Sequence, residues 1–158
     1  MSVSPRIGVV IPVFHGADDL RQTLTAFRAL PTHVLAQLEV VVADGASTDD
    51  TLNVMSTFMD VIRHADSRND LGVYDAMNRG AGLVQAPYVW FLGAGDLPLA
   101  EGLLTLLGRL EGDMGHACTV LAMAPREPGV PAEFVPQFGK SLDWRNTVSY
   151  THLRAHET

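Results

Sequence analysis

The feature that most constrains this chain is the alternation of short, apolar, β-branched runs with longer segments of helical periodicity. The runs predicted as strands are Arg6–Phe14, Leu38–Ala43, Val61–His64, Tyr88–Leu92 and Cys118–Ala124. Strands separated by helical segments of ~10–15 residues form βαβ units, in which neighbouring strands run parallel. The pattern therefore predicts an α/β fold, a three-layer α/β/α sandwich with a mainly parallel sheet.

Helical patterns fill the intervals between these runs. From Asp18, apolar residues recur at helical spacing until Pro31 ends the segment; they are Leu20, Leu24, Phe27 and Leu30. Ser47 or Thr48 is a natural N-cap for a helix that continues to about Met59. Two further helices are predicted over Val73–Val84, with Met77, Ala81 and Val84 facing inward, and over Leu99–Leu110.

Composition excludes several classes of protein. A length of 158 residues favours one domain, and one cysteine excludes an internal disulfide and a four-thiolate zinc site. The net charge of -7 argues against nucleic acid as a partner, because such proteins present a basic face. No apolar run reaches the ~18–20 residues of a membrane span, and no secretory signal pattern is present. We expect a cytoplasmic protein without a transmembrane segment.

Polar and small residues follow three of the predicted strands. They are His15 after the first strand, Asp44–Ser47 after the second and Gly93–Asp96 after the fourth. Ligands of open parallel sheets bind in the crevice beyond the carboxyl ends of the strands. The carboxylates of Asp44 and Asp96 would repel each other there unless a cation or a donor-rich ligand lay between them. Two alternatives stay open: Asp44 caps the following turn, and Asp96 begins the next helix.

Three common nucleotide and hydrolase motifs are absent from the sequence. There is no G-x-x-x-x-G-K-[ST] loop, no G-x-G-x-x-G after the first strand and no G-x-S-x-G elbow. A P-loop, a dinucleotide-binding Rossmann domain and an α/β-hydrolase nucleophile are therefore not predicted.

Four segments, taken in order, resemble a known family. The segments IGVVIPVF, VVADGASTDDT, NDLGVYDAMNRG and VWFLGAGD resemble the nucleotide-binding half of family 2 glycosyltransferases, which have the GT-A fold. The resemblance covers about Arg6 to Asp96, with a weaker continuation to about Ala124. It implies an enzyme that moves a sugar from a nucleotide-diphosphate donor, UDP-linked in the typical case, to a glycan or a lipid-linked acceptor with inversion.

The resemblance also implies residue roles. Pro12, Val13 and Phe14 would lie along the nucleobase, and Asp44 would hydrogen-bond the base. Asp70 would line the nucleotide-sugar pocket, together with the helix that carries Asp75, Asn78 and Arg79. Asp96 matches the last acid of the D-x-D motif and would hold Mg²⁺ or Mn²⁺ against the diphosphate.

The sequence departs from the family pattern at several positions. His15 stands where Asn is frequent, Ala43 where the first acid of an Asp-Asp pair is expected, and Ala94 where the D-x-D motif begins. The catalytic base of the family lies well downstream of the D-x-D motif, and no acid of this chain has the matching context. We therefore assign no catalytic base from the sequence.

Three other functions stay open at this point. The chain could be a nucleotide-binding fragment without turnover, because the base and the acceptor region are missing. A sugar-phosphate nucleotidyltransferase is disfavoured because Phe14–Asp18 lacks a Gly-rich, basic signature. An α/β domain with no nucleotide site is the remaining alternative. Contact with the inner face of a membrane would fit a lipid-linked acceptor.

The last eleven residues are treated separately. The segment 148–158 (VSYTHLRAHET) has no apolar period and resembles translated sequencing-adapter read-through. We expect residues 1–147 to form an incomplete GT-A domain, and 148–158 to be a non-native tail. On this interpretation the native protein continues past about Thr147.

Overall fold

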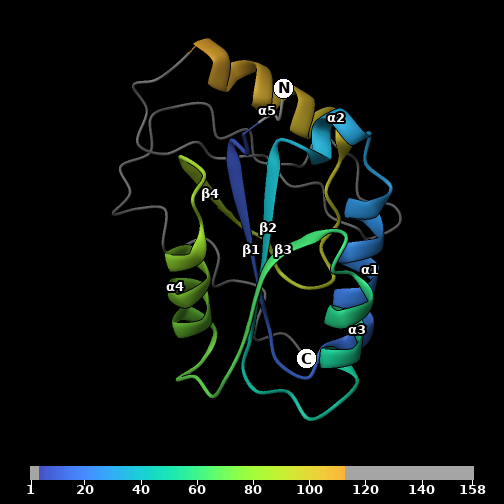
Figure 1. The fold of residues 1–158 in the computed structure, drawn as a ribbon, viewed down its shortest axis with the longest axis vertical. Helices are drawn as coiled ribbons and strands as arrows, with labels where there is room; N and C mark the ends of the chain where they lie inside the picture. The colour runs from blue at the N-terminus through green and yellow to red at the C-terminus, as the bar shows by residue number, and fades with distance from the viewer. Residues whose placement is uncertain (1–3, 113–158) are drawn as a thin grey trace, which may run out of the picture. The chain divides into compact units, whose positions relative to one another are not determined.

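A four-stranded sheet forms the centre of the computed structural model, which describes residues 4–112. The strands are β1 (Ile7–Val13), β2 (Leu38–Asp44), β3 (Ile62–Ser67) and β4 (Tyr88–Phe91), in the order β3-β2-β1-β4. Every neighbouring pair is parallel (Figure 1). The predicted parallel sheet is thus confirmed within these residues. The expected strand Cys118–Ala124 lies outside them.

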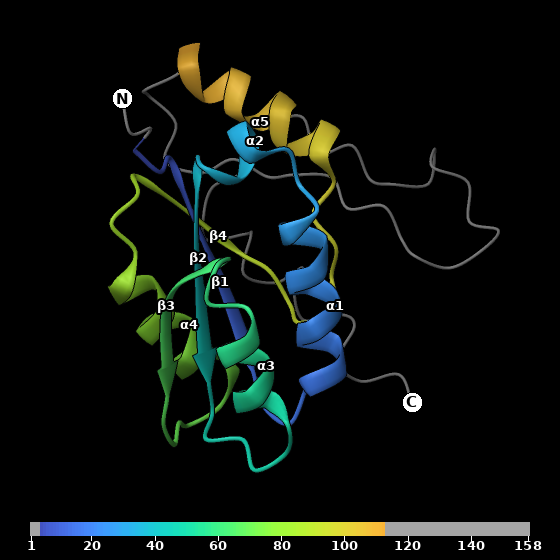
Figure 2. The same ribbon diagram turned by 45° about the vertical axis from the view of Figure 1, so that its right-hand side comes forward.

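Helices cover both faces of this sheet. They are α1 (Ala17–Arg28), α2 (Thr32–Leu35), α3 (Thr51–Thr57), α4 (Val73–Leu83) and α5 (Ala100–Gly112). Figure 1 shows α4 on one face and α1 with α3 on the other, which gives the predicted three layers. Figure 2 shows α5 beside α2 at the edge of the sheet where β1 starts. The carboxyl ends of the strands lie at the opposite edge. Among the described residues, none of the helices is both long and apolar enough to cross a bilayer.

The core is built around β1 and β2, in which every residue is buried. β1 consists mainly of β-branched residues, and β2 carries a run of three valines at its centre, which suits strands covered on two faces. From α1, the side chains of Leu20, Leu24 and Phe27 are fully buried, as the helical spacing predicts. Because both strands are fully buried, they give the loops that follow them a rigid starting point.

Helix α4 approaches the sheet more closely than its sequence suggests. Its buried residues are Ala76 and Gly80, whereas the predicted inward residues Met77, Ala81 and Val84 are only half-buried. A Cβ atom on Gly80 would lie 2.4 Å from Val10 Cγ1, so only glycine allows this contact. Val84, directly after α4, does face the sheet as predicted, because a Cβ atom on Gly8 would lie 2.2 Å from Val84 Cγ1. The sequence missed Ala76 and Gly80 because apolar periodicity selects large side chains.

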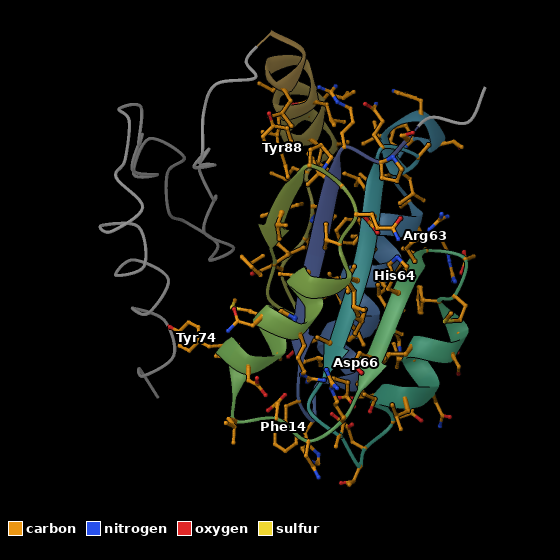
Figure 3. The ribbon with its side chains drawn as sticks, turned by 60° about the vertical axis from the view of Figure 1, so that its left-hand side comes forward. Phe14, Arg63, His64, Asp66, Tyr74 and Tyr88 are labelled. Atoms are coloured by element: carbon orange, nitrogen blue, oxygen red, sulfur yellow. The ribbon has the colours of Figure 1, made fainter. Side chains whose placement is uncertain are left out.

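Strand β3 extends further than predicted and contains a bulge. Val40 pairs with Ile62 but Val41 pairs with His64, so Arg63 is an extra residue. Because of this shift, His64 and Asp66 lie opposite Val41 and Ala43, on the face covered by α4. Figure 3 labels Arg63, His64 and Asp66 along this strand. The bulge thus brings two polar side chains to the face where Glu39 and Arg79 can contact them.

Candidate functional site

A cavity of about 600 Å³ opens where β1 and β2 end. Its walls come from the end of β1, the connections that follow β1, β2 and β3, and the first turn of α4. The lining residues are Pro12, Val13, Phe14, His15, Gly45, Ala46, Thr48, Asn69, Asp70, Gly72, Val73 and Ala76. The cavity lies in the crevice at the carboxyl ends of parallel strands, where the sequence places the ligand.

Two lining residues have strained backbone conformations. His15 has φ 49° and Ala46 has φ 63°, both in the left-handed region that favours glycine. The amide of His15 donates to Ser47 Oγ at 2.8 Å, which holds the two loops together. The ring of Phe14, labelled in Figure 3, is exposed and meets the His15 ring edge to face at 4.1 Å. Strain of this kind concentrates at functional sites, because the surrounding structure must support its cost.

Asp44 lies behind the cavity wall. Its side chain is fully buried and accepts hydrogen bonds from the Ser47 amide, the Ser47 hydroxyl and the Ser67 hydroxyl. These three donors occupy the carboxylate, and Asp44 is not among the lining residues. Its contacts are those of the turn-capping alternative, and its contact with a base stays a prediction.

The carboxylate that reaches the cavity wall belongs to Asp70. A Cβ atom on Gly45 would lie 2.9 Å from Asp70 Oδ2 and 3.1 Å from Phe14 Cδ2, so the absent side chain of Gly45 makes room for both groups. Asp70 Oδ1 accepts the Gly72 amide at 3.0 Å, and Asp70 Oδ2 pairs with Arg79 at 3.1 Å. The acid is thus held in one orientation while it lines the cavity.

Arg79 holds the acids at the end of β3 from behind. Its side chain is 9% exposed; Nη1 pairs with Asp66, and Nη2 with Asp70 and the Asp44 carbonyl oxygen. Its Nε is buried and has no hydrogen-bond partner. Arg68 also pairs with Asp66, at 3.1 Å. Sequence reasoning missed Asp66; the signal that could have found it is the polar run that follows the apolar start of β3.

The other predicted site residues lie away from the cavity lining. Asp75 Oδ2 accepts the Leu71 amide at 3.2 Å, at the start of α4, and Asn78 is exposed on the same helix. Asp96 is exposed at the end of a turn closed by its amide and the Gly93 carbonyl oxygen at 3.1 Å. Their roles in binding a donor stay predictions.

No group of three or more His, Cys, Asp or Glu side chains that could hold a metal ion occurs within residues 4–112. Asp96 offers a single exposed carboxylate. Mg²⁺ is often bound through one or two carboxylates, with phosphate oxygens and water as the remaining ligands. This donor set therefore fits an ion that the nucleotide helps to hold.

Asp49 connects two of the loops near the cavity. Its carboxylate accepts the Thr51 hydroxyl at 2.6 Å, the Thr51 amide at 3.1 Å and the Ala17 amide at 3.3 Å. The hydrogen bond from the Thr51 hydroxyl is the largest cause that lowers the pKa of Asp49 below 3.8. The ionised form of Asp49 thus joins the start of α1 to the start of α3.

Comparison with known proteins assigns the fold and the motifs to a family. The family model described as glycosyl transferase family 2 matches residues 8–143. The chain belongs to glycosyl transferase family 2. Among solved structures it resembles TarS 1-349 of S. aureus in complex with UDP-GlcNAc, with a TM-score of 0.58, 21% identity and coverage of 67% of this chain and 31% of the other.

A second solved relative is the mannosyltransferase PcManGT from Pyrobaculum calidifontis in complex with GDP-Man and Mn²⁺. The TM-score is 0.60 at 23% identity, over 72% of this family 2 chain and 34% of the other. Such a likeness shows the fold, and the predicted GT-A type is confirmed by it.

Curated relatives carry glycosyltransferase names. The PGL/p-HBAD biosynthesis glycosyltransferase of Mycobacterium bovis is 36% identical over 98 residues, which is 59% of this family 2 chain and 36% of the relative. The validoxylamine A glucosyltransferase of Streptomyces hygroscopicus is 41% identical over 96 residues, 59% of this chain and 22% of the relative. The chain thus spans about a third or less of the length of these two relatives.

Proposed function

We propose that this chain is the donor-binding part of a glycosyltransferase, and that its cavity binds the nucleotide of a nucleoside-diphosphate sugar. The observation that carries the proposal is the carboxylate of Asp70, held at the cavity wall by Arg79 and the Gly72 amide. The family match and the position of the cavity at the carboxyl ends of the strands support it.

In this proposal Asp70 recognises the base. Uracil and guanine both carry a ring N–H, and an ionised carboxylate is a strong acceptor for such a donor. Phe14 packs against the base, and Pro12 and Val13 form the floor beneath it. Asp44 supports the wall from behind through Ser47 and Ser67. The solved relatives, one with UDP-GlcNAc and one with GDP-Man, support both bases as candidates.

The chemistry follows from the charge on the leaving group. Departure of a nucleoside diphosphate from the anomeric carbon builds negative charge on the diphosphate. Asp96 would hold a divalent ion, Mg²⁺ or Mn²⁺, which supplies Lewis-acid stabilisation of that charge when bound. A carboxylate base would then accept the proton of the acceptor hydroxyl. No residue between 4 and 112 is assigned to that step, and the proposed outcome is inversion.

The acceptor and the location of the enzyme belong to the same proposal. The proposed acceptor is a glycan or a lipid-linked molecule, as the family resemblance implies. The cytoplasmic location and the contact with a membrane surface rest on the family resemblance alone.

Titration calorimetry of the full chain with UDP, GDP and CDP, with and without Mn²⁺, tests the base-binding role. We expect UDP or GDP to bind better than CDP. Asp70→Asn should weaken that nucleotide about ten-fold, because it replaces one charge-assisted hydrogen bond by a neutral one. Asp60→Asn is the matched control, since it removes one negative charge from an exposed pair with Arg28.

Two results would contradict this assignment. Undiminished affinity in Asp70→Asn would remove Asp70 from base recognition. Absence of nucleotide binding by a chain that unfolds cooperatively would remove the donor site itself.

A second candidate function is nucleotide binding without turnover. It is favoured by the length of the chain, which spans 36% of one relative and 22% of another. Binding without transfer or hydrolysis of a nucleotide sugar would support it, and measurable transfer by this chain would exclude it.

A further inference from the structure

We propose that Thr23 of α1 is a positioning residue, which fixes the turn Gly93–Asp96 and thereby sets where the Asp96 carboxylate meets the diphosphate of a bound donor. The inference rests on the proposed function. It assigns a role to a residue that none of the sequence motifs includes.

The hydroxyl of Thr23 makes two hydrogen bonds to that turn. The residue is 0% exposed; Oγ1 donates to the Asp96 carbonyl oxygen at 2.8 Å and accepts from the Gly95 amide at 2.9 Å. A threonine inside a helix commonly bonds the carbonyl oxygen one turn back. Thr25, on the same helix, does so with Arg21 at 2.7 Å. Thr23 instead joins α1 to a segment more than 70 residues along the chain.

The turn itself depends on glycine. Gly95 has φ 96°, a conformation that L side chains rarely adopt, and a Cβ atom there would lie 3.4 Å from Asp19 of α1. A Cβ atom on Gly93 would lie 3.0 Å from Asp96 Oδ2, so the carboxylate folds back over that glycine. Glycine therefore permits the conformation of the turn, and the two hydrogen bonds of Thr23 hold the turn in it.

The position of Asp96 matters because a single carboxylate offers few ligands. An ion held by one protein oxygen and the phosphates of a nucleotide needs that oxygen in the correct place when the donor binds. A shift of the turn would leave the base-binding cavity unchanged, because the residues that line the cavity lie outside the turn. The contribution of Thr23 should thus be confined to the metal-dependent part of nucleotide affinity.

A purely structural role predicts a different pattern. In that case the hydroxyl would only satisfy the Gly95 amide, and its loss would lower the free energy of unfolding without a selective effect on metal-dependent binding. The two roles are separated by measuring stability and binding on the same variants.

The experiment compares Thr23→Val, which keeps the shape and removes the hydroxyl, with Thr23→Ser, which keeps the hydroxyl. Thr25→Val removes a hydroxyl from the same helix without touching the turn. Affinities for UDP and GDP are measured on the full chain by calorimetry, with and without Mn²⁺, beside urea unfolding. We expect Thr23→Val to lose about ten-fold of the gain that Mn²⁺ gives, with metal-free affinity within about two-fold of the parent.

Thr23→Ser and Thr25→Val should both keep the gain. Gly95→Ala is a second test that leaves the buried hydroxyl in place. It displaces the same turn by backbone strain and should cause the same selective loss, whereas Gly82→Ala, in open space on α4, should not. These variants test the inference even where Thr23→Val does not fold.

Several results would overturn the inference. One is that Mn²⁺ raises the nucleotide affinity of Thr23→Val and Gly95→Ala as much as it raises that of the parent. Another is that these variants lose equal affinity with and without the metal. A gain that survives Asp96→Ala, which removes both side-chain oxygens, would also do so, since Asp96 would not then be the ligand. Failure of the parent chain to bind any nucleotide would instead reject the proposed function, and this inference with it.

Discussion

Strand β2 carries one buried acid near each end, and the two acids have different consequences. Glu39 accepts the amides of Gln85 and Ala86, both at 2.9 Å, and contacts His64 Nε2 at 3.0 Å. Asp44 accepts its hydrogen bonds from Ser47 and Ser67, next to loops that line the cavity. Each carboxylate is satisfied by the protein, so burial of an acid does not itself mark a site. The role of each acid depends on where its hydrogen-bond donors lie. Glu39 holds the segment at Gln85 and Ala86, whereas Asp44 holds the loop of Ser47 beside the cavity.

Glu39→Ala should give the largest effect, and it should be on stability alone. The change leaves two backbone amides without an acceptor and creates a cavity, so we expect a loss of about 3 kcal/mol in the free energy of unfolding. Urea denaturation measures it. Nucleotide affinity of the folded fraction should stay within about two-fold, and a larger loss would show that the two ends of β2 are not independent.

Asp44→Asn should affect both stability and binding. The remaining oxygen can accept the Ser47 amide and the Ser67 hydroxyl, but the amide nitrogen cannot accept the Ser47 hydroxyl, and the lost charge weakens the other two bonds. The change should cost about 2 kcal/mol in urea denaturation. The loops that carry Gly45 and Ala46 should shift, and the affinity for UDP or GDP should fall several-fold in calorimetry. If stability falls while affinity is unchanged, Asp44 does not shape the cavity.

Gly45→Ala should weaken binding with little effect on folding. The new methyl group would lie 2.9 Å from Asp70 Oδ2 and would displace the acid or fill the cavity. We expect about a ten-fold loss of nucleotide affinity with stability within about 1 kcal/mol of the parent. Gly82→Ala is the matched control: it should leave binding unchanged and raise stability by up to about 1 kcal/mol, since nothing lies near the added Cβ.

Acid should slightly lower the free energy of unfolding through two carboxylates, Asp49 and Asp60. The pKa of Asp49 is lowered from 3.8 chiefly by the Thr51 hydroxyl, and that of Asp60 chiefly by its hydrogen bond from Arg28. Because each pKa is lower in the folded state, the stability that these groups contribute is present above 3.8 and is lost as the pH falls through the lowered values. Urea unfolding at about pH 7 and about pH 3 measures the loss.

Asp49→Asn and Asp60→Asn should each reduce this acid-dependent loss. Only Asp49→Asn should also alter nucleotide binding, because Asp49 joins the loops at the starts of α1 and α3, whereas Asp60 pairs with Arg28 on the exposed surface. Equal effects of the two variants on binding would contradict the comparison.

The sequence predicted the parts of the fold that local pattern determines. β1 and β2 were found because strands buried on both faces are continuous apolar runs, and α1 because its large residues recur at helical spacing. Strand β3 was predicted too short, because the bulge at Arg63 changes which residues face the sheet neighbour. The inward position of Val84 was predicted, but the contacts of Ala76 and Gly80 were missed because such small residues carry little hydrophobic signal.

The cavity could be placed from the sequence, but its contacts could not. The carboxyl ends of the strands indicate where a ligand would bind, and the motif order indicates the family. The support of Asp70 by Arg79, the partners of Asp44 and the bond between Thr23 and Asp96 join residues far apart in the chain. Such pairings depend on the register of the strands and on helix packing, which single-sequence patterns do not specify.

The most direct test is a map of backbone amide chemical-shift changes, recorded by NMR on the full chain titrated with UDP and with GDP in the presence of Mg²⁺. The account predicts saturable shifts in the three loops that line the cavity, at residues such as Phe14, Ala46 and Gly72, and none around Glu39 and its partner amides. Saturable shifts centred on the Glu39 end of β2, or none from either nucleotide, would contradict it.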